Sequence, residues 1–155
     1  MRTIVASVLY TLLAVTLCEA RKPRCTLRAH VEANSHDGPT FSTQFRSPTS
    51  GKNVVIQKMP TVSERDVTGF APYQANDGSY GVLIQLDKHG TLALDSLSIE
   101  RRGTMLFVFI NGRLVTELRI DRRVSDGRIY LPSGLTPNDL ALMKKEWRLI
   151  GQRKK

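Results

Sequence analysis

The side chains best suited to acid–base or metal chemistry are scattered along this 155-residue chain. The three histidines, His30, His36 and His89, include no pair at the spacing of metal ligands. The sequence also contains no Gly-x-Ser-x-Gly turn for a hydrolase nucleophile and no glycine-rich phosphate loop. We therefore interpret the histidines as solvated side chains, and we predict no metal site and no bound cofactor.

Asp87 and Asp95 come nearest to the carboxylate pair that general acid–base catalysis would need. They flank residues 91–102, where the apolar spacing fits either a strand or one face of a helix, so their separation stays undetermined. Aspartates at strand ends and on helix surfaces commonly cap a backbone or are solvated. We therefore expect no acid–base role for this pair and no enzymatic activity.

Residues 1–20 have the pattern of a secretory signal peptide. Residues 3–17 are uncharged and mostly apolar, follow a single basic residue, and precede a small-residue stretch that ends at Ala20. This run is shorter than the roughly 20 apolar residues of a membrane-spanning helix. We predict cleavage after Ala20 and an extracytoplasmic protein, periplasmic or secreted. A lipid anchor at Cys18 is the alternative, although the preceding Leu17 is bulkier than a lipoprotein signal favours.

Cleavage after Ala20 leaves Cys25 as the single cysteine of the mature chain, so no disulfide can form within it. Cys25 lies just before a predicted strand, and we interpret it as a small buried hydrophobe rather than a reactive thiol. The remaining length suits one domain, which must be stabilised by packing alone.

The chain is strongly basic, with a formal net charge of +9. A basic protein ordinarily raises nucleic acid as a partner, but export argues against that partner here. The basic residues are spread along the chain in pairs rather than gathered in one tract. Such pairs suit acidic polypeptide, anionic lipid headgroups or cell-wall polymer. Two pairs are our candidate binding residues: Arg101, Arg102, Arg122 and Arg123.

Alternating apolar residues predict strands in the N-terminal third of the chain. A strand over 26–33 is followed by a turn and by a strand over 40–46, which we expect to be its hairpin partner. A short strand over 53–57 follows, and then Ser63 and Asp66 have the spacing that caps the start of a short helix.

The second half carries the stronger pattern. We predict strands over 80–86 and 104–110, and then Asn111-Gly112, which is typical of a tight hairpin turn, leading into a strand over 114–120. A short strand over 128–131 precedes a helix that begins at Thr136. The apolar face of that helix is expected to comprise Leu140, Met143, Trp147 and Ile150. The fold class is α+β: a mostly antiparallel sheet with one or two helices packed on one face.

Residues 60–143 resemble the periplasmic head domain of SecD and SecDF, the accessory membrane proteins of bacterial preprotein translocation. In that family a Pro-Ser/Thr stretch opens a short helix, which is similar to residues 60–67 here. A strand with a glycine heading the next helix matches 82–86 and Gly90. A second glycine and an apolar strand that ends in Asn-Gly match Gly103 and residues 105–112. The resemblance implies a helix for the ambiguous residues 91–102.

The resemblance also implies a division of the chain and a class of function. With the signal peptide predicted over 1–20, it suggests an N-terminal extension over 21–59 and a head-like domain over 60–155. The extension either joins the main sheet or forms a separate flap. No segment after residue 20 is apolar enough to cross a bilayer, so the resemblance implies a bacterial binding module without transport machinery. Its expected partner is exported polypeptide or a complex in the cell envelope, with anionic lipid or cell-wall polymer as the alternative.

Overall fold

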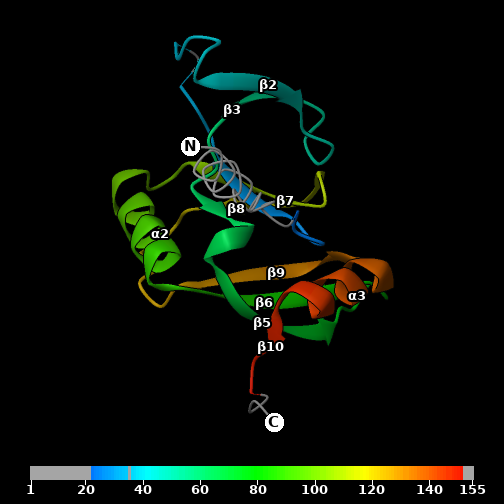
Figure 1. The fold of residues 1–155 in the computed structure, drawn as a ribbon. Coiled ribbons are helices and arrows are strands. Elements are labelled where there is room, and N and C mark those ends of the chain that lie inside the picture. The colour runs from blue at the N-terminus through cyan, green and yellow to red at the C-terminus, as the bar shows by residue number, and fades with distance from the viewer. Residues whose placement is uncertain (1–21, 35, 152–155) are drawn as a thin grey trace, which may run out of the picture.

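The computed structural model describes residues 22–34 and 36–151, which form two facing four-stranded sheets, a separate two-stranded ribbon and two α-helices (Figure 1). The predicted signal peptide and Cys18 lie outside these residues. The α+β class and the predominance of antiparallel pairing are confirmed, and the strands are divided between two sheets. Within the described residues, no helix is both long and apolar enough to span a membrane.

The first sheet has the strand order β4-β1-β7-β8, and every pairing in it is antiparallel. β7 and β8 form the hairpin predicted at Asn111-Gly112, where both residues have positive φ angles, 50° and 76°. β1 lies between β4 and β7, so the N-terminal segment supplies a central strand of this sheet. The strand bounds are β1 Leu27–Val31, β4 Val62–Ser63, β7 Met105–Ile110 and β8 Arg113–Arg119.

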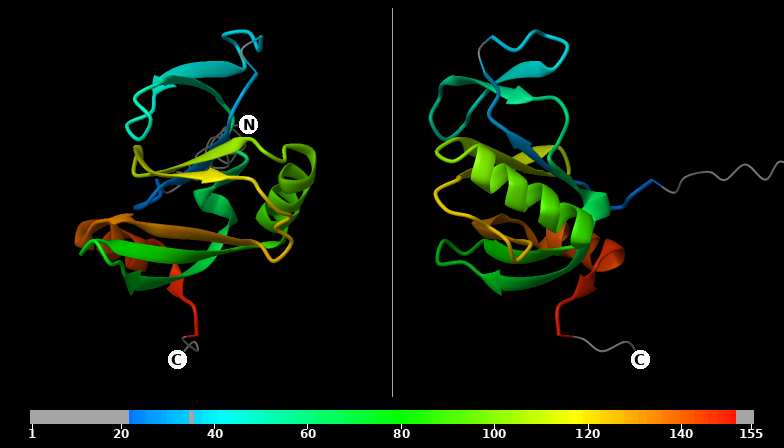
Figure 2. Two further views of the ribbon diagram at one scale, coloured as in Figure 1. Left: turned by 180° about the vertical axis from the view of Figure 1, so that it is seen from behind. Right: turned by 90° about the vertical axis from the view of Figure 1, so that its left-hand side faces the viewer.

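The second sheet has the order β10-β5-β6-β9. Its pairings are antiparallel except that β10 runs parallel to β5. The two sheets lie as layers, with β9 and β6 facing the first sheet in both views of Figure 2. The strand bounds are β5 Val67–Gln74, β6 Tyr80–Leu86, β9 Arg128–Leu135 and β10 Arg148–Leu149.

The core lies between the two sheets, because alternate residues of each strand point to one face of a sheet. From the first sheet, Leu27, Val108 and Ile110 are fully buried, and from the second sheet Phe70 and Ile84 are too. Burying large aliphatic and aromatic side chains contributes roughly 1.5–3 kcal/mol each, so this interface supplies most of the favourable free energy of folding.

Two helices close the gaps at the ends of the layers. α2, Lys88–Glu100, is the helix that the family resemblance implied, and Asp87 caps it by accepting a hydrogen bond from the Gly90 amide. α3, Pro137–Glu146, begins as predicted, with Thr136 and Asp139 forming a reciprocal capping box. α3 ends at Glu146, earlier than predicted. Trp147 is buried in an extended conformation and Ile150 is exposed, so the predicted helix face is wrong beyond Met143.

The remaining strands form a ribbon of β2, Ser42–Arg46, and β3, Asn53–Gln57, which arches over the outer face of the first sheet (Figure 2). The prediction that residues 40–46 pair with 26–33 is wrong, because β1 already has β4 and β7 on its two sides. The short helix predicted after Ser63 is a single 3-10 turn, Glu64–Asp66. β5 follows it directly, and the sequence pattern missed that strand.

Candidate binding cleft

A cleft between β8 and β9 combines a volume suited to a ligand with side chains from both sheets, and we take it as the candidate site. These strands are edges of different sheets, and the segment 120–127 joins them. They lie close at one end and enclose a cleft of about 800 Å³ at the other. The close end is held by polar contacts around Asp139, and the open end is lined by apolar and basic side chains.

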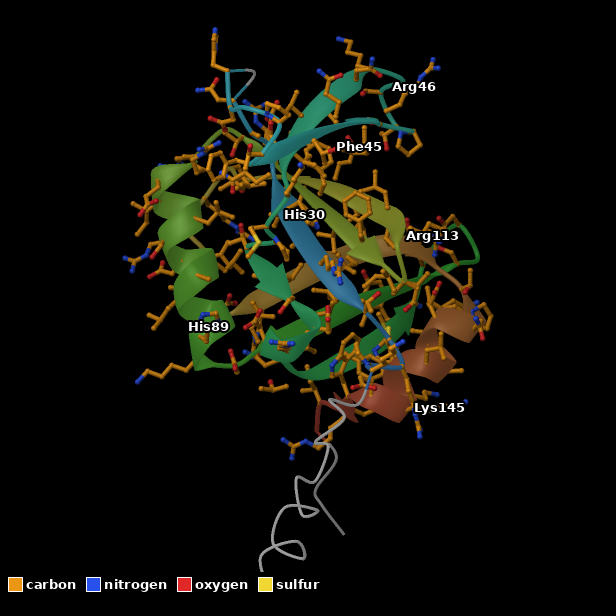
Figure 3. All side chains as sticks on the ribbon, turned by 45° about the horizontal axis from the view of Figure 1, so that its top comes forward. His30, Phe45, Arg46, His89, Arg113 and Lys145 are labelled. Atoms are coloured by element: carbon orange, nitrogen blue, oxygen red, sulfur yellow. The ribbon has the colours of Figure 1, made fainter. Side chains whose placement is uncertain are left out.

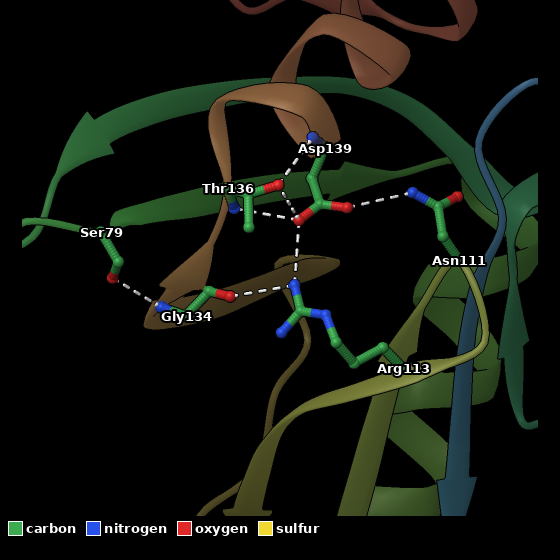
Figure 4. A network of polar contacts seen from close by, with 6 residues as sticks. All are labelled: Ser79, Asn111, Arg113, Gly134, Thr136 and Asp139. Carbon is green, nitrogen blue, oxygen red and sulfur yellow. Dashed lines mark hydrogen bonds and ion pairs between the residues drawn. The ribbon is translucent and has the colours of Figure 1, made fainter.

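The Asp139 network closes one end of the cleft (Figure 4). The Asp139 carboxylate accepts hydrogen bonds from the Thr136 amide at 2.9 Å and hydroxyl at 2.8 Å, which begin α3. Asn111 Nδ2 and Arg113 Nη2 also donate to it, at 3.2 and 2.9 Å. Arg113 Nη2 further donates to the Gly134 carbonyl in β9 at 3.1 Å. The hairpin of the first sheet is therefore joined to β9 and α3 at this end.

The negative charge of Asp139 is balanced by the positive charge of Arg113. Burial alone would raise the pKa of Asp139, but the Thr136 and Asn111 hydrogen bonds and the Arg113 charge outweigh it, so the pKa lies below its ordinary value. The carboxylate therefore stays ionised at neutral pH. We interpret the network as structural, because Thr136, Asn111 and Arg113 all donate hydrogen bonds to Asp139 of the same protein.

The open end of the cleft has an apolar floor. The floor comes from both sheets and from α2, and its members are Leu94, Leu106, Leu118, Ile120 and Ile129. Leu118 is half-buried, whereas Ile120 and Ile129 are 7% and 3% exposed, so apolar surface continues from the rim into the core. An apolar floor of this kind suits side chains of a bound molecule rather than an ion alone.

The rim of the cleft is basic. Arg119, Arg122 and Arg128 line it and are exposed, and none of them forms an ion pair with a carboxylate among the described residues. Two aspartates, Asp121 and Asp126, lie on the same rim, so the arginines outnumber the carboxylates. The cleft therefore favours a ligand with negative charge.

The backbone at the cleft is also available for pairing. In the described part of the chain, β8 pairs only with β7 and β9 only with β6, which leaves one long edge on each sheet. The opposite edges are β4 and β10, each two residues long. Short edges offer little to a second chain, whereas a long edge presents a row of unpaired N–H and C=O groups. Pro132 lacks an N–H in β9, so β8 is the better edge for pairing.

The structure brings two of the four arginines chosen from the sequence to the cleft and leaves the other two outside its lining. Arg101 ends α2 and donates to the Glu32 carbonyl at 2.7 Å, and Arg102 donates to the Asp121 carbonyl at 2.9 Å. Arg123 makes two hydrogen bonds to Asp95, at 2.6 and 2.8 Å. Arg122 and Arg123 both line the cleft, and Arg122 is the one of the two without an ion pair to a described carboxylate. The sequence analysis missed Arg119 and Arg128. Arg119 ends β8 and Arg128 begins β9, so their positions on either side of the loop 120–127 could have indicated a shared site.

The aspartates considered for catalysis have structural partners. Asp87 caps α2 and Asp95 pairs with Arg123. They lie eight positions apart along α2, which corresponds to about 12 Å along the axis, too far for a shared proton. Cys25 is fully buried, and burial raises the pKa of its thiol to about 12, as expected of a packed hydrophobe.

None of the three histidines, all within the described residues, lines the cleft, and Figure 3 shows His30 and His89 apart from each other. His89 is exposed on α2 and its Nδ1 lies 2.8 Å from Asp66 Oδ1. Asp66, Asp87 and His89 present ligand atoms within 4.8 Å of one another, but Asp66 and Asp87 already accept backbone hydrogen bonds that cap helices. His30 is half-buried beneath the ribbon rather than solvated, and its Nδ1 donates to the Gln57 carbonyl at 2.8 Å.

Fold and cleft together define a two-layered α+β domain with one long free edge on each sheet. No protein-family model and no curated protein matches the sequence. Two solved structures share the fold, each with a TM-score of 0.55. One, described as SecDF, a membrane component that enhances protein export, is 12% identical over 86% of this chain and 70% of that chain. The other, SecDF in a "super-membrane-facing form", is 14% identical over 83% of this chain.

The fold of this chain is therefore SecDF-like, and the resemblance inferred from residues 60–143 is confirmed at the level of fold. The chain spans only 20% of the second SecDF structure.

Proposed function

We propose that this protein is a non-enzymatic extracytoplasmic module that binds an extended, acidic segment of unfolded polypeptide in the cleft between β8 and β9. The observation that carries the proposal is the free edge of β8 beside an apolar floor and a basic rim. Main-chain pairing supplies affinity to an extended segment, and the side-chain surroundings select its composition. The SecDF-like fold supports the proposal, because that protein is described as enhancing protein export.

The alternative, a basic surface that binds anionic lipid or cell-wall polymer, has no specific observation in its favour. Arg101, Arg102 and Arg123 are engaged by the chain itself, so the predicted basic pairs do not form one free patch. Binding of the purified protein to anionic vesicles at low salt, with no binding to unfolded polypeptide, would favour this alternative.

Two unfolded chains of opposite charge test the proposal. Reduced, carboxamidomethylated α-lactalbumin is acidic, and lysozyme treated in the same way is basic. We expect the acidic chain to bind more tightly in fluorescence anisotropy. A photo-reactive amino acid placed at Ser125 or Tyr130, both on the cleft, should crosslink to it, whereas one at the exposed Ser96 of α2 should not. Equal crosslinking from Ser96 would contradict the proposal.

Strand addition has its own measurement. A segment that pairs with β8 should slow hydrogen–deuterium exchange at the outward-facing amides of Arg113–Arg119. Exchange at β2, on the far side of the first sheet, serves as the internal control. Binding without any change in β8 exchange would overturn the strand-addition step.

A further inference from the structure

A second cavity, of about 510 Å³, lies between the β2–β3 ribbon and the outer face of the first sheet. It shares no lining residue with the cleft between β8 and β9, so the inference drawn from it does not rest on the proposed function. The cavity lies within the size range of sites for small organic ligands, about 300–1,000 Å³. We call it the ribbon cavity, and the side chains on which the argument depends are Arg28, His30, Phe45, Ile56, Lys58 and Phe109.

The floor of the ribbon cavity is aromatic. Phe109 of β7 contacts His30 of β1 and Phe45 of β2, with ring centroids 5.6 and 5.7 Å apart. In Figure 3, Phe45 and His30 lie on the same side of the molecule, where the ribbon passes over β1. Phe45 and Phe109 are each only half-buried, so the chain itself leaves part of this aromatic surface uncovered. Apolar groups of a ligand would complete its burial.

The charge at the ribbon cavity is positive. Arg28 and Lys58 line it, and none of the described lining residues is acidic. Arg28 is exposed and pairs with no carboxylate in the ranges that the structure describes, while Lys58 Nζ donates to the Pro39 carbonyl. His30 adds no full charge at neutral pH, because burial lowers its pKa and outweighs the opposite effect of the hydrogen bond to the Gln57 carbonyl. The guanidinium of Arg28 is therefore the available partner for an anion.

From this combination we infer that the ribbon cavity binds a carboxylate joined to an apolar group, with the carboxylate on Arg28 and the apolar group against Phe45 and Phe109. A planar guanidinium can hold both carboxylate oxygens. Two sources supply this chemistry: a free aryl or alkyl acid, and the C-terminus of a polypeptide that ends in an apolar residue.

The test uses 4-phenylbutyrate and its neutral counterpart 4-phenylbutanol, titrated into the 15N-labelled protein and followed by NMR. We expect shifts concentrated at the amides of β1, β2 and β7, and an affinity for the acid about tenfold higher than for the alcohol. Equal affinity for acid and alcohol, or shifts located elsewhere, would overturn the inference. Absence of binding at 10 mM probe would overturn it as well.

Two variants separate the roles of charge and surface. Arg28→Gln should weaken 4-phenylbutyrate binding about tenfold and leave 4-phenylbutanol unchanged. Arg65→Gln removes the same charge from an exposed position outside the cavity and should change neither affinity. Equal losses in the two variants would show non-specific attraction and contradict the inference. Because Arg28 is exposed and its side chain forms no hydrogen bond or ion pair with another described residue, its variant should keep the wild-type spectrum.

A further arm distinguishes the two sources. An acetylated tetrapeptide with a C-terminal phenylalanine is compared with the same peptide as a C-terminal amide. Tighter binding of the peptide acid than of 4-phenylbutyrate, with loss in the amide, assigns the cavity to polypeptide C-termini. Tighter binding of the free acid assigns it to small acids. Both outcomes support the shared chemistry, and binding of the peptide amide as strongly as the peptide acid contradicts it.

Discussion

At the scale of single residues, Asp139 joins the two halves of the molecule. Its carboxylate caps α3 and at the same time receives donors from Asn111 and Arg113, which follow β7 and begin β8. The helix cap was predictable from the local order Thr136-Pro137. The contacts with Asn111 and Arg113 were not, because a long-range partner leaves no trace in the spacing of neighbouring residues.

Replacing Asp139 with asparagine should therefore cost stability. Asp139→Asn keeps the shape of the side chain but removes the charge that Arg113 and the Thr136 donors stabilise. We expect the free energy of unfolding at pH 7 to fall by about 1–3 kcal/mol in urea denaturation. Asp121→Asn, at an exposed carboxylate on the cleft rim, is the control and should be nearly neutral.

The same carboxylate predicts a dependence on pH. Its pKa is lowered in the folded protein, so its contribution is fully present above the unfolded value, about 3.9, and is lost as the pH falls through the folded pKa. Between pH 5 and pH 2, wild-type protein should lose stability more steeply than Asp139→Asn. Parallel curves would show that Asp139 is not stabilised as an anion.

His89 predicts a dependence of the opposite sign. Its hydrogen bond to Asp66 raises its pKa, so the charge-dependent stabilisation is present below about pH 6.5 and is lost as the pH rises through the folded pKa. In His89→Gln this part of the pH dependence should disappear. NMR titration of the imidazole gives the direct measurement, and a midpoint at or below 6.5 would contradict the contact.

At the scale of elements, β5 is the strand that the sequence analysis did not predict. Gly69 and Pro72 read as breaks in a pattern. In the structure, Gly69 lies where β10 approaches, and a Cβ there would be 3.0 Å from the Arg148 carbonyl oxygen. Pro72 remains in register with Val82 of β6. Gly69 therefore accommodates the close approach of β10, although in the sequence alone a glycine at this position argues against a strand.

Gly81 of β6 has a related role. Tyr73 of β5 lies across it, donates its hydroxyl to the Leu131 carbonyl at 2.7 Å and stacks on Tyr130 with ring centroids 5.4 Å apart. A Cβ on Gly81 would lie 2.2 Å from Tyr73 Cζ. The glycine therefore lets one tyrosine cover the outer face of the second sheet.

Gly81→Ala should displace Tyr73 and lower the free energy of unfolding by about 1–3 kcal/mol. Tyr73→Ala removes the obstruction, so the double variant should be more stable than the sum of the two single effects implies. Urea denaturation of all four proteins completes the cycle. Additive effects would mean that Tyr73 does not cover Gly81 in solution.

At the scale of the whole molecule, the β2–β3 ribbon lies outside both four-stranded sheets. It contacts the first-sheet side through Phe45, the Glu32–Ile56 bridge and the Gln57 carbonyl. Two more hydrogen bonds join them, from Ala33 N to the Val55 carbonyl and from the Ser47 hydroxyl to Glu117. The sequence predicted β3 and placed β2 correctly along the chain, but it paired β2 with β1. Which strands become neighbours depends on contacts far apart in sequence, so alternation alone could not decide this pairing or divide the strands between two sheets.

The ribbon should therefore open before the two sheets. We expect amides in Ser42–Arg46 and Asn53–Gln57 to exchange with deuterium faster than those of β1 and β7 at pH 7. β6, a central strand of the second sheet, provides the slow reference. Exchange of the ribbon at the rate of β7 would show that it folds as one unit with the core.

The Asp139 network also closes one end of the cleft in which we propose that polypeptide binds. β8 is seven residues long, about 23 Å, and at its Arg113 end the side chain of Arg113 already spans to the Gly134 carbonyl. If a polypeptide pairs with β8 as proposed, it meets a blocked end at Arg113 and cannot slide lengthwise through the cleft. Such a polypeptide would have to bend away from β8 at this end or dissociate. The proposed mode of binding therefore favours holding and releasing one short segment over movement along a polypeptide.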